Sequence, residues 1–300
     1  MLRLGIVDFD SSHSVEFARR FNHKTHDRGQ FVDGAEVVVA WPGSSDMAPD
    51  RIAGFRSEIE SFNIPLVSRI EDMFDQIDAV LILSLSGAAH LNRVQPFLEA
   101  GIPAYVDKPF ACSVADARQM IALAERNNVT LFNGSGLRFA EEVLDITRHR
   151  KTFGAVQGAI TYGPAKRADG NPGLFHYGIH AVEVLFELLG PECESLTTTY
   201  TSGAEVITGC WSGDRLGTVR GLRGRTTPYG FLAFCENGTV QRDVSTRFAY
   251  RNLCRRIVES IESEIPAVPH ESSLKVVQFV TASLESERRG GSTVRLDTVP

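Results

Sequence analysis

The chain has 300 residues and a formal net charge of −6, with 43% hydrophobic and 23% charged residues. This balance is ordinary for a globular protein, and an acidic chain without a basic stripe is not expected to bind nucleic acid. No apolar run is long enough to span a bilayer and no cleavable leader is visible, so we expect a cytoplasmic protein without membrane contact. The five cysteines are scattered and never at CxxC spacing, which favours reduced thiols.

Strand-like and helix-like segments alternate through the first part of the chain. Apolar runs predict strands at 2–7, 35–41, 77–85, 104–106 and 129–134. Amphipathic patterns predict helices at 15–21, 52–61, 91–100 and 113–128. This alternation is typical of a doubly wound parallel sheet, so we expect a Rossmann-like domain over residues 1–138.

The pattern changes near residue 140, where strands with turn signals between them begin. Predicted strands occupy 154–163, 206–211, 216–224, 229–235, 239–244 and 293–299, and predicted helices occupy 141–150, 177–189 and 274–288. Ser212-Gly213-Asp214 is a hairpin signal between two of these strands, and Asn237-Gly238 is a stronger one. Residues 139–300 therefore predict an α+β domain with a largely antiparallel sheet. A hairpin sheet with one uncovered face also predicts a homodimer or homotetramer.

Four segments share motifs with one known family. They are AYVDKPFACSVADARQMIALAE (104–125), NGSGLRFAEEV (133–143), FHYGIHAVEVLFELLG (175–190), and the closing helix followed by GGSTVRL (290–296). In order and spacing they resemble the Gfo/Idh/MocA oxidoreductase family (glucose–fructose oxidoreductase, inositol dehydrogenase and relatives). The resemblance implies an NAD- or NADP-dependent oxidoreductase. Its substrate would be a sugar, polyol or related small molecule, oxidised at a hydroxyl in the cleft between the domains.

The resemblance assigns the central chemical roles to Lys108 and His180. Lys108 follows a predicted strand, whose carboxyl end would face the ligand crevice, and its ammonium can polarise the reacting oxygen. Asp107 before it replaces the glutamate usual in the family. His180, in the first turns of a predicted helix, corresponds to the general base that removes the hydroxyl proton.

His176, a third candidate catalytic residue, and Arg138 complete the predicted substrate site. His176 stands where the family usually has an aspartate, and its spacing from His180 predicts that both lie on one helix face. Two such histidines could instead share a metal with Glu183, although we assign no metal ligand. Arg138, from the R-F segment, could meet an anion or hold the interdomain hinge, and both interpretations stay open.

The predicted cofactor-binding residues lie where strands would meet the following helices. They are Phe9, Asp10, Ser11, Ser12, His13, Ser44, Ser86, His90, Asp107 and Lys108. The second strand is followed by no acid before Asp46, although dinucleotide sites commonly have one there for the ribose diol. Ser44 and Ser45, which follow the second strand, could contact a ribose or a 2′-phosphate, or simply form a turn.

In the first strand–helix junction, GIVDFDSSHS (Gly5–Ser14), the turn that follows the strand contains no glycine. Aligned without gaps, Asp8, Asp10 and His13 occupy the positions of the three glycines that let a pyrophosphate approach. Their side chains fill this space, and two of them add negative charge. We therefore expect weak dinucleotide binding, with the cofactor displaced outward.

Two other classes of function remain open from the sequence. One is a non-redox lyase or isomerase, or a metal-assisted enzyme, that uses the histidine pair. The other is a sugar-binding or regulatory protein that has kept the fold and lost dinucleotide chemistry.

Overall fold

The computed structural model describes residues 1–224 and 228–300 and divides into two compact units. The first unit comprises Met1–Ala111, Asp116–Gly134 and Tyr250–His270, and the second comprises Cys112–Ala115, Ser135–Ala249 and Glu271–Pro300. Among these described residues, no helix is both long and apolar enough to cross a bilayer. The predicted fold class is confirmed, because one unit contains a parallel sheet and the other a mainly antiparallel sheet.

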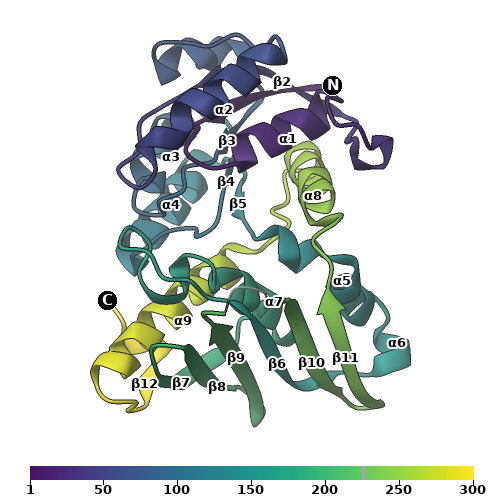
Figure 1. The fold of residues 1–300 in the computed structure, drawn as a ribbon, viewed down its shortest axis with the longest axis vertical. Helices are drawn as coiled ribbons and strands as arrows, with labels where there is room; N and C mark the ends of the chain where they lie inside the picture. The colour runs from purple at the N-terminus through teal and green to yellow at the C-terminus, as the bar shows by residue number, and fades with distance from the viewer. Residues whose placement is uncertain (225–227) are drawn as a thin grey trace. The chain divides into compact units, whose positions relative to one another are not determined.

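The parallel sheet of the first unit has the strand order β2-β1-β3-β4-β5 (Figure 1). Its strands are β1 (Leu2–Val7), β2 (Ala35–Trp41), β3 (Ala79–Ile82), β4 (Ala104–Val106) and β5 (Leu131–Asn133). Its helices are α1 (His13–Phe21), α2 (Pro49–Ser61), α3 (His90–Glu99) and α4 (Val114–Asn127). Because all the paired strands run parallel, their carboxyl ends lie at one edge, where the loops carry the predicted cofactor residues.

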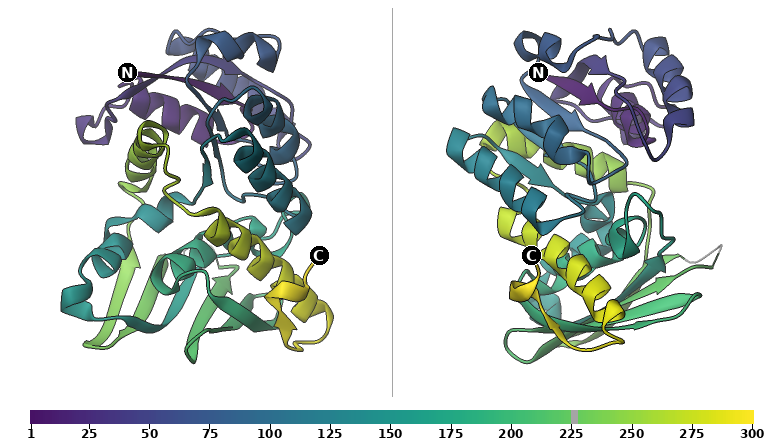
Figure 2. Two further views of the ribbon diagram at one scale, coloured as in Figure 1. Left: turned by 180° about the vertical axis from the view of Figure 1, so that it is seen from behind. Right: turned by 90° about the vertical axis from the view of Figure 1, so that its left-hand side faces the viewer.

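Helices cover both faces of this sheet, which explains the apolar strands. Every side chain of β3 is fully buried, as expected for a strand covered on both sides. Figures 1 and 2 show α1 and α8 on one side of the sheet and α3 and α4 on the other. The predicted strand 77–85 is longer than β3, because its ends continue as loops toward the sheet edges.

A helix that the sequence analysis missed, α8 (Ala249–Ser263), belongs mainly to the first unit. The predicted boundary at 138/139 must therefore be corrected, since Tyr250–His270 returns to the Rossmann-like unit. Leu253, Ile257 and Ile261 recur at intervals of four and are buried, a helical apolar stripe that could have been recognised in the sequence. The helix lies beside α1 (Figure 1).

The sheet of the second unit has the order β11-β10-β6-β9-β8-β7-β12. Its strands are β6 (Val156–Pro164), β7 (Cys193–Tyr200), β8 (Ala204–Trp211), β9 (Arg215–Leu222), β10 (Tyr229–Cys235), β11 (Gly238–Val244) and β12 (Val294–Arg295). Its helices are α5 (Glu141–Arg148), α6 (Arg150–Phe153), α7 (Ile179–Leu189) and α9 (His270–Arg288). Both predicted hairpins are present, β8–β9 and β10–β11, whereas β7 was not predicted.

One face of this second sheet packs against α7, and the opposite face carries exposed apolar side chains. In β10, Phe231 and Ala233 are buried while Phe234 is 40% exposed; in β9, Leu216 is 55% exposed. Gly158 of β6 pairs with both Phe234 and Leu216, so these two side chains flank it on the same face. The outer face therefore carries an exposed apolar pair near the ends of these three strands.

Candidate functional site

The turn after β1 is organised around a buried carboxylate, that of Asp8. This residue has a φ of 70°, the left-handed conformation that favours glycine. Its carboxylate accepts hydrogen bonds from the Ser84 hydroxyl and from Arg93 Nε, the latter at 2.9 Å. Burial raises the pKa of the Asp8 carboxyl, while Arg93 and Ser84 act in the opposite direction.

The other loop residues also have partners within the first unit. Asp10 Oδ1 accepts a hydrogen bond from the Leu85 backbone N–H at 2.9 Å. Ser12 is the N-cap of α1 but makes no side-chain cap bond; the Ser11 hydroxyl instead accepts from the His13 N–H. Phe9 is fully buried. Within residues 1–224 and 228–300, the backbone N–H groups of Ser11 and Ser12 have no acceptor, as is usual at a helix start.

His13 connects α1 with the end of β4 and with α8. Its Nδ1 lies 2.6 Å from Asp107 Oδ2, and its Nε2 lies 3.0 Å from the Tyr250 hydroxyl. The Tyr105 hydroxyl lies 3.1 Å from Asp107 Oδ1 and donates there or to the Gly134 carbonyl oxygen at 2.9 Å. A buried polar chain thus occupies the position at which a dinucleotide loop usually has its third glycine.

Lys108 directly follows Asp107 at the carboxyl edge of the sheet and is 8% exposed. Burial by itself raises the pKa of the Asp107 carboxyl, but His13 and Lys108 hold it well below its usual range. Asp107 is therefore a permanent negative charge beside the lysine. The Asn133 side-chain amide donates to the Val106 and Asp107 carbonyl oxygens and so holds this strand end in place.

A polar cavity of about 270 Å³ lies at this edge of the first unit. It brings together three predicted cofactor residues: Asp10, Ser44 and Ser86. Asn92 and Arg93, which also line it, were missed by the sequence analysis. One signal in the sequence could have identified Arg93. It is a positively charged residue in the first turn of a helix that follows a buried strand, where an apolar residue would be expected to pack on the sheet.

His90, another predicted cofactor residue, is fully buried. Its ring nitrogens lie 3.1 Å from the Phe110 carbonyl oxygen and 3.0 Å from that of Ser84. Both ring nitrogens therefore contact backbone carbonyl oxygens, and these contacts indicate a structural role for His90.

His180 lies in the first turn of α7, as predicted, and is half-buried. Its Nδ1 lies 2.6 Å from the Ser135 hydroxyl, which also accepts from the Leu137 N–H. Ser135, not predicted from the sequence, thus orients the imidazole. His176 does not share the helix face with His180, contrary to the prediction, because α7 begins only at Ile179.

Arg138 is buried in the second unit and contacts two carboxylates. Its guanidinium lies 2.6 Å from Glu183 Oε2, 3.0 Å from Glu187 Oε2 and 3.3 Å from the Ser272 hydroxyl. These contacts tie the segment after β5 to α7 and α9 and favour a structural task over anion binding. Glu183 is thereby occupied, and within the described ranges no three potential ligands form a metal-binding group.

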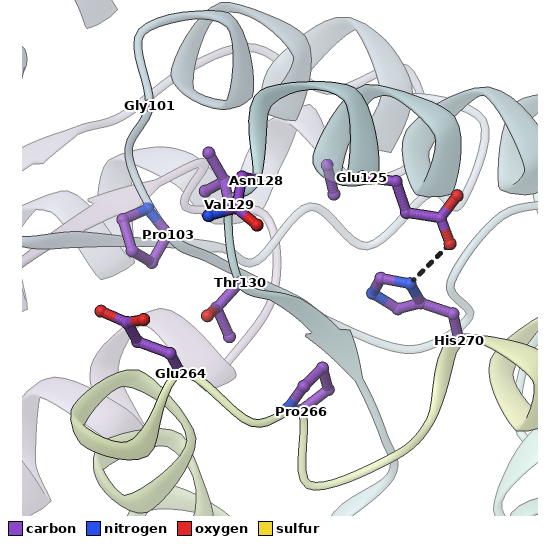
Figure 3. Close-up of a pocket in the computed structure, with 10 residues that line it drawn as sticks. Gly101, Pro103, Glu125, Asn128, Val129, Thr130, Glu264, Pro266 and His270 are labelled. Atoms are coloured by element: carbon purple, nitrogen blue, oxygen red, sulfur yellow. Dashed lines mark ion pairs between the residues drawn. The ribbon is translucent and has the colours of Figure 1, made fainter.

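A second cavity of the first unit, of about 370 Å³, lies at the opposite edge of the sheet (Figure 3). It is lined by residues that precede β4 and β5, such as Pro103 and Thr130, and by Glu264. Glu125 and His270 form an ion pair at its rim, with 3.5 Å between Oε1 and Nδ1. No residue predicted from the sequence lines this cavity, so the candidate site remains at the carboxyl edge.

Comparisons with known proteins agree with the class that this fold defines. Residues 16–135 match the GFO_IDH_MocA family model, described as an oxidoreductase family with an NAD-binding Rossmann fold. The oxidoreductase YceM of Salmonella typhimurium is 36% identical over 103 residues, 34% of this chain and 33% of that protein. D-apiose dehydrogenase of Paraburkholderia graminis is 30% identical over 132 residues, 44% of this chain and 33% of that protein.

Each alignment therefore spans about a third of the length of the curated relative. The scyllo-inositol dehydrogenase of Lactobacillus casei, solved with NAD(H) and scyllo-inositol, shares the fold over 99% of this chain and 100% of that chain. The TM-score is 0.81 at 13% identity. Residues 16–135 thus match the Gfo/Idh/MocA oxidoreductase family that the motifs indicated, and the solved structure shares the fold of both units.

The Asp107 charge generates a prediction about stability. An unfolded aspartate has a pKa of about 3.9, and the pKa of folded Asp107 is lower. The ionised Asp107 carboxylate thus stabilises the folded state fully above the pKa that it has in the unfolded chain. This stabilisation is lost as the pH falls through the lower pKa of the folded state. We expect Asp107→Asn to lower the free energy of unfolding by about 1–3 kcal/mol at neutral pH, and by less as the pH approaches 3.

Urea unfolding across this pH range measures the difference, with the exposed Asp33→Asn as the matched control. A loss for Asp107→Asn that stays constant across the range would contradict the assignment of a depressed pKa.

Proposed function

We propose that this chain is a nicotinamide-dinucleotide-dependent dehydrogenase that oxidises a hydroxyl of a sugar, polyol or related small molecule. The observation that carries the proposal is Lys108 at the carboxyl edge of the parallel sheet, beside the buried negative charge of Asp107. The match of residues 16–135 to the family model and the similarity to D-apiose dehydrogenase support the same class of reaction.

The residues at the sheet edge fit a dinucleotide, although not in the manner of a glycine loop. Unsatisfied N–H groups at the start of α1 suit a phosphate, and the cavity offers the polar side chains of Ser44, Ser86 and Asn92. Asp8 and Asp10 oppose a pyrophosphate placed against the turn. Outward displacement with weakened binding therefore stays our prediction.

When bound, the nicotinamide supplies the hydride acceptor. The remaining roles belong to this chain's own groups. The Lys108 ammonium would hold the reacting oxygen, with the Asp107 carboxylate as a fixed negative charge beside it. The His180 imidazole, oriented by the Ser135 hydroxyl, would accept the hydroxyl proton. His176 remains a proposed substrate contact, whereas Arg138 is left out because its guanidinium is engaged by carboxylates.

The substrate class rests on the relatives. D-apiose dehydrogenase acts on a sugar by its name, and the scyllo-inositol dehydrogenase was solved with a polyol. A second candidate, a sugar-binding protein without dinucleotide chemistry, is favoured by the filled glycine positions Asp8, Asp10 and His13. Binding of a sugar without turnover would select this second candidate.

A second copy of the chain is the proposed partner, giving a homodimer or homotetramer. The apolar outer face around Gly158, with Leu216 and Phe234 exposed, supports this association because large apolar patches on monomers are rare. We also retain the cytoplasmic location as a proposal that rests on the scattered cysteines.

The lysine assignment predicts a specific kinetic effect. Lys108→Ala should lower kcat by roughly a hundredfold or more, rather than only raise KM, because its contact is strongest in the transition state. The measurement is reduced-nicotinamide absorbance in a panel of sugars and polyols with NAD and NADP. Lys151→Ala, at an exposed lysine, is the control. Unchanged kinetics in a folded Lys108→Ala variant would refute the assignment.

The outer-face assignment predicts the oligomeric state. Light scattering should give a dimer or tetramer for the wild type and a monomer for Leu216→Glu/Phe234→Glu, since charges on a buried apolar interface are costly. The matched control is Ala53→Glu/Ser57→Glu on the exposed surface of α2 in the first unit. A monomeric wild-type protein would rule out this partner.

A further inference from the structure

The end of β2 offers no acid to a ribose diol. Trp41 is followed by Pro42, Gly43, Ser44 and Ser45. In Rossmann domains an acid at this point binds the 2′-hydroxyl of NAD, whereas an arginine nearby accommodates the 2′-phosphate of NADP. The side chain next to the end of β2 therefore helps to determine whether NAD or NADP is preferred.

Asp8 fills the space that a side chain at the end of β2 would occupy. A Cβ at Gly43, whose φ is 67°, would overlap Asp8 Oδ1. The Asp8 carboxylate is 1% exposed and is covered by Arg93, so it cannot itself reach a ribose hydroxyl. Its effect on a ligand is to hold the guanidinium in place.

Arg93 is held at the cavity from three sides. Its Nε donates to the Asp8 carboxylate, its guanidinium carbon lies 4.9 Å from the centre of the Trp41 ring, and its Nη2 lies 3.3 Å from the Ser44 hydroxyl. Nη1 has no acceptor within residues 1–224 and 228–300. Two fixed donor groups, one of them charged, therefore line the cavity next to β2.

We propose that Arg93 and Ser44 bind the 2′-phosphate of NADP(H), and that the chain prefers NADP(H) to NAD(H). This inference rests on the proposed dehydrogenase function and specifies which of the two nicotinamide dinucleotides the enzyme uses. The Nη1 group of this planar guanidinium, which has no acceptor among the described residues, can donate to a phosphate. Two acids near the cavity would repel a phosphate only weakly. Asp46 is exposed to water, which screens its charge, and Asp10 Oδ1 accepts a hydrogen bond from the Leu85 N–H.

Calorimetry with two nicotinamide-free probes tests the phosphate site apart from the hydride chemistry. Adenosine 2′,5′-bisphosphate should bind at least roughly tenfold more tightly than adenosine 5′-monophosphate, as expected for charge-assisted hydrogen bonds to the added phosphate. Ser44→Asp, which places an acid on the exposed loop after β2, should abolish this preference. Ser57→Asp, which adds the same charge on the exposed surface of α2, should keep it.

Arg93→Lys retains the charge opposite Asp8 and so protects folding, but it loses the planar fork; it should reduce the preference at least severalfold. Equal affinity for the two probes, or a preference unchanged in Ser44→Asp, would overturn the inference. Preference for the bisphosphate without any dehydrogenase turnover would support this inference while refuting the proposed function.

Discussion

The candidate site depends on one constraint, the burial of the Asp8 carboxylate at the end of β1. A buried charge is tolerated only with a partner and with hydrogen bonds. Arg93 and Ser84 supply both, and in doing so they link the ends of β1 and β3 to α3. Removal of one member of such a pair typically costs about 3–5 kcal/mol. The pair therefore stabilises the fold, and it determines what space is left for a ligand.

A second set of buried polar contacts also holds neighbouring elements together, on the other side of the turn after β1. His13 bridges Asp107 and Tyr250, so that the start of α1, the end of β4 and the start of α8 are held together. Glycine at residue 13 would leave Asp107 without this contact. The glycine-free turn and these polar contacts thus belong to one arrangement, which places a fixed negative charge beside Lys108.

Much of this fold followed from the sequence, because apolar strands and hairpin signals are local patterns. The bounds of β1, β2 and β4 and the turn at Asn237-Gly238 were predicted in this way. The Asp8–Arg93 contact joins residues that are 85 positions apart, so no local pattern reveals it. The position of His176 was wrong for a different reason: helical spacing was assumed before the helix begins. The return of α8 to the first unit likewise depends on tertiary packing.

The most direct test of a site built around the Asp8–Arg93 pair is a crystal structure of the protein with NADPH. The account predicts an intact pair, the 2′-phosphate within hydrogen-bond distance of the Arg93 guanidinium and the Ser44 hydroxyl, and the pyrophosphate outside the Asp10 side chain. A pyrophosphate seated directly against the turn, with Asp8 and Arg93 separated, would contradict it.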